Sequence, residues 1–148
     1  INVAGKTVLD VGSGSGVVAI AAAMVGAKKV IASDIDPVSR LAIMANSQLN
    51  DADVKIIGDF NDYFSMYDSR HEVDVITVAD VLYDRNNIPF IDVLMEKTQQ
   101  LILADSRVKN FSYPGLIHRD ALAGETLPNL GGFDEFKTVN IFYKAVSY

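Results

Sequence analysis

Asp80 and Tyr83 are the two side chains of this sequence that best fit direct contact with a reacting substrate. They lie in the segment "VADVLYD", after a strongly apolar run, and their spacing is D-x-x-Y. A carboxylate can accept a hydrogen bond from an incoming amine and orient the lone pair of that amine. A tyrosine can pack against the substrate or form a hydrogen bond to it through its hydroxyl. The plainer alternatives are a carboxylate that only shapes a pocket and a tyrosine that packs in the core.

A second candidate is the glycine-rich loop in "VLDVGSGSG" near the start of the chain, with Gly12, Gly14 and Gly16 at alternate positions. Such a loop between a strand and a helix brings backbone N–H groups close to a ligand. A P-loop is excluded because no Gly-Lys-Ser/Thr follows, and Val17 stands where a dinucleotide-binding G-x-G-x-x-G needs its third glycine. Asp10, two residues before the first glycine, would repel a pyrophosphate and suits a ligand with an amino group or a cation.

Two further carboxylates follow the next apolar run, in "ASDIDP". Asp34 comes eighteen residues after Gly16, where a carboxylate can accept both hydrogen bonds from a ribose diol. The alternative is that Asp34 or Asp36 begins a turn or caps the helix expected after Pro37. We assign the ribose to Asp34 and the helix cap to Asp36.

With these residues in place, "VLDVGSGSG" resembles the first motif of class I S-adenosylmethionine-dependent methyltransferases. The resemblance implies that the loop packs against the methionine part of the cofactor, which carries an ammonium and a sulfonium but no phosphate. It also implies that Asp59, in "IIGDF", accepts a hydrogen bond from the adenine edge beside Phe60; an ordinary loop carboxylate is the alternative. The cofactor-binding residues expected on this basis are Asp10, Gly12, Ser13, Gly14, Gly16, Asp34, Ile35, Asp59, Phe60 and Ala79.

Four segments resemble one branch of that family, and the resemblance runs from about Thr7 to Phe142. They are "ASDIDP", "ADVLYDR", "LILADSR" and "FDEFKTVNIF", and the branch methylates the β-subunit of electron-transfer flavoprotein. Its bacterial members are often labelled nicotinamide N-methyltransferase-like. The resemblance implies in-line methyl transfer from S-adenosylmethionine to a protein lysine, with catalytic roles for Asp80 and Tyr83, no metal, and a location in the cytoplasm or, in a eukaryote, the mitochondrial matrix.

Three alternatives stay open at this point: transfer to a small amine, a non-catalytic remnant that keeps the fold, and an NAD-binding domain.

Departures from the branch pattern concern the substrate side. Only six residues precede Thr7, where relatives usually carry a segment that covers cofactor and substrate, so we expect a single catalytic domain without it. Relatives tend to have "GDPGR" where this sequence has "ADSRV".

The composition limits the function classes further. The chain has 148 residues, the size of one domain, with a net charge of −6 and no cysteine. No basic run exceeds two residues, so we expect no nucleic-acid partner, and no apolar run is long enough to span a bilayer. His71 and His118 stand alone in polar sequence, which argues against a metal site.

Alternating short apolar runs and amphipathic runs predict an α/β fold in which the candidate residues follow parallel strands. The fold expected is a Rossmann-like, seven-stranded methyltransferase sheet with five parallel strands, a C-terminal antiparallel pair and helices on both faces. Strands are predicted at 7–11, 28–34, 53–59, 73–80 and 101–105, and helices at 17–25, 38–49 and 86–100. In the helix at 38–49 one apolar face is predicted from Val38, Leu41, Ala42, Ala45 and Leu49. The antiparallel pair is expected from "GETLPN" (124–129) and residues 134–148, joined at Gly131–Gly132.

Overall fold

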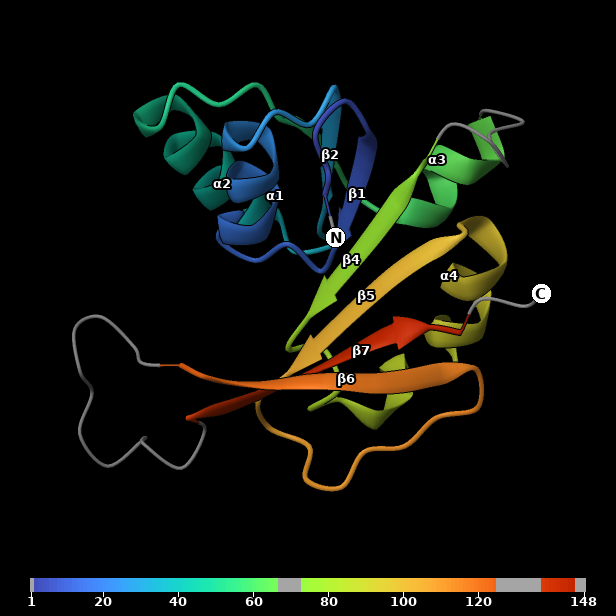
Figure 1. Ribbon diagram of the computed structural model, residues 1–148. Helices are drawn as coiled ribbons and strands as arrows, with labels where there is room; N and C mark the ends of the chain where they lie inside the picture. Colours follow the sequence, from blue (N-terminus) through green and yellow to red (C-terminus); the bar gives the residue numbers. More distant parts are fainter. Residues whose placement is uncertain (1, 67–72, 125–136, 146–148) are drawn as a thin grey trace.

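A seven-stranded mixed sheet with helices on both faces organises the computed structural model, which describes residues 2–66, 73–124 and 137–145 (Figure 1). The elements follow one another as β1 (Thr7–Val11), α1 (Val17–Met24), β2 (Lys29–Ser33), α2 (Pro37–Leu49), β3 (Lys55–Ile57), α3 (Phe60–Met66), β4 (Val75–Ala79), the 3-10 turn η1 (Arg85–Asn87), α4 (Phe90–Lys97), β5 (Gln100–Asp105), β6 (Leu116–Ala123) and β7 (Thr138–Lys144). None of the described helices has the length and apolar content needed to cross a membrane.

The strand order is β3-β2-β1-β4-β5-β7-β6. Strands β1 to β5 are mutually parallel, while β7 runs antiparallel to both β5 and β6. This confirms the predicted five parallel strands with a C-terminal antiparallel pair. The direction of strand progression reverses between β1 and β4, and ligands of open α/β sheets bind at the carboxyl ends of the strands beside such a point.

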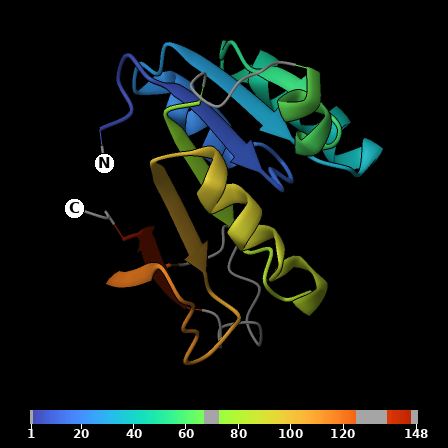
Figure 2. The ribbon, with the colours of Figure 1, turned by 90° about the vertical axis from the view of Figure 1, so that its right-hand side faces the viewer.

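Side chains that alternate along the central strands build two separate cores. Val8 and Val75 face α1 and α2, whereas Leu9 and Ile76 face α3 and α4. All four are fully buried, as expected for parallel strands covered on both faces. The turned view shows α4 lying across its face of the sheet (Figure 2). The prediction of helices on both faces is therefore confirmed.

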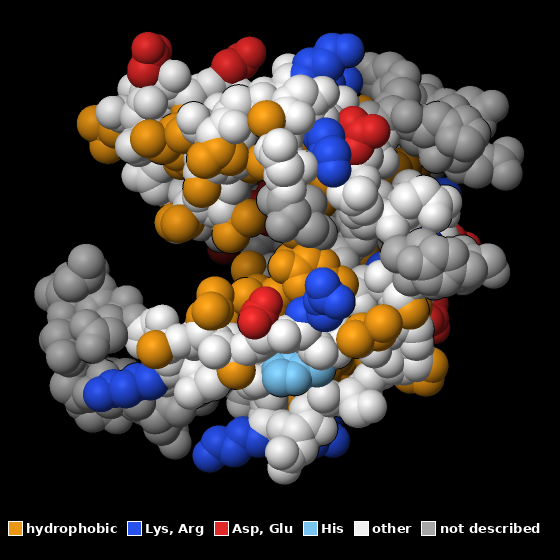
Figure 3. Space-filling view, viewed as in Figure 1, with side chains coloured by type: hydrophobic (Ala, Val, Ile, Leu, Met, Phe, Trp, Pro, Cys, Tyr) orange, Lys and Arg blue, Asp and Glu red, His pale blue; other side chains and the backbone are white. Residues whose placement is uncertain are grey.

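Helix α2 is present as predicted, but its predicted apolar face was wrong. The helix buries Ile43 and Ser47, whereas Val38, Leu41 and Leu49 are 69%, 61% and 82% exposed. Ile43 instead packs where Gly16 leaves room, because a Cβ built on that glycine would lie 3.2 Å from Ile43 Cγ2. Close packing at one glycine therefore sets the rotation of the helix, and exposed apolar side chains gather over α1 and α2 (Figure 3).

The antiparallel pair exists, but its first strand was predicted too late in the chain. Strand β6 spans Leu116–Ala123, and "GETLPN" beyond Gly124 lies outside the described residues, as do Gly131 and Gly132. Most of β6 is exposed, and its pairing with β7 shifts register between His118 and Asp120. Because a bulge and an exposed edge remove the apolar alternation, the pattern of side chains did not indicate a strand there.

Helix α4 is shorter at both ends than the predicted 86–100. Residues 85–87 form a separate 3-10 turn, and Thr98 ends the helix in an extended conformation with φ −145° and ψ 155°. Beyond it, Lys144 of β7 donates hydrogen bonds to the carbonyls of Met95 (2.6 Å) and Thr98 (2.8 Å). A cation at the C-terminus of a helix satisfies orphan carbonyls and complements the helix dipole.

This contact predicts that Lys144→Met lowers the free energy of unfolding by about 2 kcal/mol, because two charge-assisted hydrogen bonds are lost while the apolar stem remains. Urea denaturation measures the change, and Lys109→Met, at an exposed lysine in the connection before β6, is the matched control. Equal shifts of the two midpoints would contradict the role given to Lys144.

Candidate functional site

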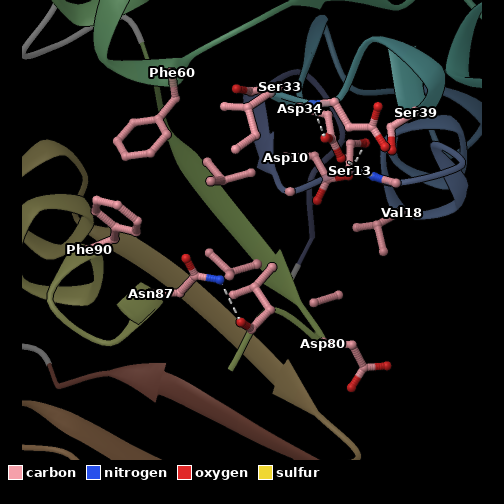
Figure 4. A pocket seen from close by; sticks show the side chains of 18 of the residues that line it. Asp10, Ser13, Val18, Ser33, Asp34, Ser39, Phe60, Asp80, Asn87 and Phe90 are labelled. Carbon is pink, nitrogen blue, oxygen red and sulfur yellow. Dashed lines mark hydrogen bonds between the residues drawn. The ribbon is translucent and has the colours of Figure 1, made fainter. Parts of the chain in front are cut away.

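A cavity of about 650 Å³ opens at the carboxyl ends of β1, β2 and β4 (Figure 4). This volume lies within the range of ordinary small-molecule and cofactor sites. Ten of the twelve residues predicted for the site line it, namely Asp10, Gly12, Ser13, Gly14, Asp34, Ile35, Phe60, Ala79, Asp80 and Tyr83. Gly16 and Asp59 do not line it.

The glycine-rich loop is fastened to the end of β2 by its own amide groups. Gly12 and Ser13 donate their N–H groups to the Ser33 carbonyl at 2.9 and 3.1 Å, and Gly14 donates to Asp34 Oδ2 at 2.8 Å. A phosphate cradle requires such N–H groups to point at the ligand. Three successive amides are engaged inside the protein instead, so the loop offers a surface for close packing rather than a nest for phosphate.

Asp10 lies beneath this loop with only 1% of its surface exposed. Its carboxylate accepts hydrogen bonds from the hydroxyls of Ser13 (2.5 Å) and Thr77 (2.7 Å) and from the backbone of Ala19 in α1. Burial raises the pKa of Asp10 above its ordinary value, against the lowering effect of these three donors, and nearby Asp34 raises it further. Asp10 therefore joins β1, β4 and α1 under the floor of the cavity.

Gly12 brings the glycine-rich loop into contact with the segment that follows β4. Its φ is +68°, and a Cβ added there would lie 2.6 Å from Val81 Cγ1. Val81 is also held by Asn87, whose Nδ2 donates to the Val81 carbonyl at 2.8 Å. Glycine is therefore required at position 12 both for the backbone conformation and for the close approach of Val81.

We expect Gly12→Ala to lower the free energy of unfolding by about 2 kcal/mol more than Gly14→Ala. Both glycines have positive φ, but a Cβ on Gly14 would meet no atom within 4 Å, so the pair separates the clash from the shared backbone cost. Urea denaturation without cofactor gives both values, and Val81→Ala combined with Gly12→Ala should recover most of the difference. Equal destabilisation by the two alanines would show that the clash is absent.

The two carboxylates after β2 have different partners. Asp34 connects the glycine-rich loop to the turn before α2. Its Oδ1 accepts a hydrogen bond from Asp36 N at 2.9 Å, and its Oδ2 accepts one from Gly14 N. Asp36 is the N-cap of α2 and accepts from Val38 N at 2.8 Å, which confirms the predicted cap. Asp34 faces the cavity between the loop and β2, the position predicted for a ribose acceptor.

Asp80 and Tyr83 both lie at the rim of the cavity beyond β4. Asp80 is exposed, and its Oδ1 accepts from the N–H and hydroxyl groups of Ser106 at 2.7 and 2.9 Å. Tyr83 is 66% exposed, which rules out core packing, and the Arg107 guanidinium lies 5.1 Å from its ring centroid. Both side chains are therefore accessible to a molecule approaching the cavity.

The opposite end of the cavity is aromatic. The rings of Phe60 and Phe90 meet edge to face at 6.0 Å between centroids, on the side of the cavity away from Asp34 (Figure 4). Asp59 is exposed, and its Oδ1 accepts from the backbone and side-chain nitrogens of Asn61. Asp59 therefore caps α3 in this structure, while Phe60 faces the cavity.

Several lining residues were not predicted, among them Ser39, Asn87, Phe90 and Leu94. They come from the first turn of α2, from η1 and from α4, so they reach the cavity only through the way in which these helices pack. The paired aromatic residues Phe60 and Phe90, thirty positions apart, share no spacing that the sequence alone could connect. Of the two histidines, His118 is exposed on β6 and His71 lies outside the described residues.

The charge of the cavity lining is one-sided. Four aspartates line it, namely Asp10, Asp34, Asp36 and Asp80, and no Lys or Arg is among the described lining residues. A site for a pyrophosphate normally offers cations or free backbone N–H groups. This lining suits instead a ligand with hydroxyl groups and positive charge.

Two curated proteins are similar in sequence to this chain. The chain is 32% identical to the electron transfer flavoprotein beta subunit lysine methyltransferase of Rattus norvegicus, over 85% of this chain and 51% of that protein. It is 37% identical to the ribosomal protein L11 methyltransferase of Enterococcus faecalis, over 86% of this chain and 37% of that protein. The chain thus spans about half or less of the length of these curated relatives.

The fold is shared with solved structures. The crystal structure of a ribosomal protein L11 methylase from Lactobacillus delbrueckii subsp. bulgaricus superposes with a TM-score of 0.61 and 20% identity, over 96% of this chain and 71% of that one. The sequence model described as "Ribosomal protein L11 methyltransferase (PrmA)" matches residues 1–110 of the 148. This match covers the glycine-rich loop, the aspartates of the cavity and the D-x-x-Y segment, and the chain belongs to this methyltransferase family.

Proposed function

We propose that the cavity binds S-adenosylmethionine and that the protein transfers its methyl group to a lysine side chain of a protein substrate. The observation on which the proposal rests is the cavity lining, with four aspartates, no Lys or Arg among the described lining residues, and an aromatic end. It matches a cofactor that has a ribose, an adenine and a cationic methionine part but no phosphate.

The residues divide between the parts of this cofactor. Asp34 would accept hydrogen bonds from the ribose hydroxyls with the lone pairs that Gly14 and Asp36 leave free. Phe60 and Phe90 would flank the adenine, and the glycine-rich loop would pack against the methionine part. Asp10, held beneath that loop by the hydroxyls of Ser13 and Thr77, would support the surface against which the methionine part packs.

S-adenosylmethionine supplies a methyl group on a sulfonium, and in the transfer a bond forms between amine nitrogen and methyl carbon as the carbon–sulfur bond breaks. A lysine amine is protonated at neutral pH, so it must release a proton to water and lose its hydration before the neutral amine can attack. Asp80 would accept a hydrogen bond from the arriving nitrogen and turn its lone pair toward the methyl group. Tyr83 would flank the alkyl chain of the lysine at the rim.

A protein lysine as the acceptor is supported by the name of the rat relative, a lysine methyltransferase of a protein subunit. Transfer to a small amine uses the same chemistry and is the competing outcome. We expect label from methyl-labelled S-adenosylmethionine to appear in acid-precipitable protein when the purified chain is incubated with cell extract. Purified electron-transfer flavoprotein β subunit and ribosomal protein L11 are offered in separate reactions.

Mass spectrometry of the labelled species identifies the modified residue. Methyl groups on lysine would support the proposal, and label confined to small molecules would favour the small-amine alternative. Binding of S-adenosylhomocysteine without label in any acceptor would point to a non-catalytic domain that keeps the cofactor site.

A further inference from the structure

Ser106, the first residue after β5, donates two hydrogen bonds to the same oxygen of Asp80. The Ser106 N–H lies 2.7 Å and the Ser106 hydroxyl oxygen 2.9 Å from Asp80 Oδ1. We infer that Ser106 is a positioning residue that fixes the orientation of the Asp80 carboxylate toward the methyl acceptor. The inference rests on the proposed function, because it assigns Ser106 a role in the transfer step for which Asp80 is proposed.

The backbone of Asp80 is held by the same neighbouring strand. Asp80 has a φ of +50°, a left-handed conformation that is uncommon outside glycine although aspartate tolerates it. Its N–H donates to the Ala104 carbonyl at 2.9 Å, one position beyond the last residue of β4. Such conformations persist where the surrounding structure fixes them, and here β5 and Ser106 provide the contacts.

Ser106 is itself set in place by the buried residue before it. Asp105 is only 1% exposed, and its Oδ1 accepts from the N–H groups of Arg107 (2.9 Å) and Val108 (2.7 Å). These bonds turn the chain sharply after β5, as aspartate side chains do when they bond to following amides. The turn leaves both donors of Ser106 directed at Asp80, so the orientation of the carboxylate depends on a turn that hydrogen bonds from Asp105 hold in shape.

The two oxygens of Asp80 are therefore not equivalent. Oδ1 receives both donors from Ser106, whereas Oδ2 accepts no hydrogen bond from the described residues, and Asp80 lines the cavity. A carboxylate anchored through one oxygen presents the other at a fixed angle. Methyl transfer requires the attacking nitrogen to lie in line with the breaking carbon–sulfur bond. The angle of the Asp80 carboxylate, which accepts a hydrogen bond from that nitrogen, is therefore expected to affect the transfer rate more than the affinity for the cofactor.

The test compares Ser106→Ala, Ser106→Thr and Ser112→Ala, the last at an exposed serine of the same connection. The probes are methyl-labelled S-adenosylmethionine with total protein of a cell extract, and S-adenosylhomocysteine in calorimetry. We expect Ser106→Ala to lower the transfer rate at saturating cofactor about tenfold, with the KM and Kd for the cofactor pair changed less than about twofold. Ser106→Thr, which keeps the hydroxyl, should retain most of the rate, and Ser112→Ala should match wild type.

The inference is overturned if Ser106→Ala transfers as fast as wild type, if it weakens cofactor binding as much as transfer, or if Ser106→Thr is as slow as Ser106→Ala. If the wild-type protein transfers no methyl group, the proposed function is wrong, but the contact between Ser106 and Asp80 is not yet tested. Hydrogen exchange tests that contact, because the Ser106 amide should be protected in wild type and lose protection in Asp80→Ala. Equal exchange in both proteins would overturn the inference.

Discussion

Asp34→Ala is expected to raise the Kd for S-adenosylhomocysteine about a hundredfold. The substitution removes the acceptor proposed for the ribose hydroxyls and also the carboxylate that fastens Gly14 to the end of β2. Each lost hydrogen bond to a charged group costs about 1.5–3 kcal/mol, so the loss of one or two accounts for this factor. Isothermal titration calorimetry measures it directly.

Asp36→Ala is the matched comparison for this experiment, since Asp36 lies two residues away and caps α2. It should lower the free energy of unfolding by about 1 kcal/mol and change the affinity for S-adenosylhomocysteine less than about threefold. An Asp36 variant that loses as much affinity as Asp34→Ala would show that the ribose acceptor has been assigned to the wrong carboxylate.

The second large effect is expected for Asp80→Asn, which should lower methyl transfer about a hundredfold and leave cofactor binding intact. Asparagine has the shape of aspartate, and its one oxygen can still accept from Ser106. Its NH₂ group then stands where Oδ2 stood, so a donor faces the incoming amine in place of an acceptor.

Rates of label transfer and calorimetry with S-adenosylhomocysteine separate the two quantities in the same protein preparation. Loss of both to the same extent would give Asp80 a structural role only, and an unchanged rate would remove it from the transfer step. Tyr83→Phe, measured alongside, shows whether Tyr83 acts through its hydroxyl or only through packing of its ring against the substrate.

The parts of the fold that position the cofactor half of the site were predictable, because there the local signals and the tertiary structure agree. Buried parallel strands leave continuous apolar runs, and one aspartate lies near the carboxyl end of each of β1, β2 and β4, namely Asp10, Asp34 and Asp80. The glycines followed from one short stretch, 8–16, and Asp34 with the helix cap at Asp36 followed from another, 32–37. The spacing of residues in the sequence predicts a part of a site when all residues of that part lie in one short loop.

Features that depend on packing between distant elements were not predictable. The rotation of α2 is set by Ile43 against Gly16, so its apolar stripe faces outward although the spacing suited a core face. Helix α3 has only seven residues and begins directly after Asp59, too short for a periodic pattern. Phe90 and Ser106 join the site through the ends of α4 and β5, whose positions relative to the cavity no local pattern encodes.

The identity of the cofactor underlies every other proposal, and one titration tests it most directly. S-adenosylhomocysteine is titrated into the wild-type protein by calorimetry, and the titration is repeated with saturating S-adenosylmethionine and with saturating NAD. We expect saturable one-to-one binding that S-adenosylmethionine abolishes and NAD leaves unchanged. Absence of binding, or displacement by NAD, would contradict the assignment of S-adenosylmethionine as the cofactor.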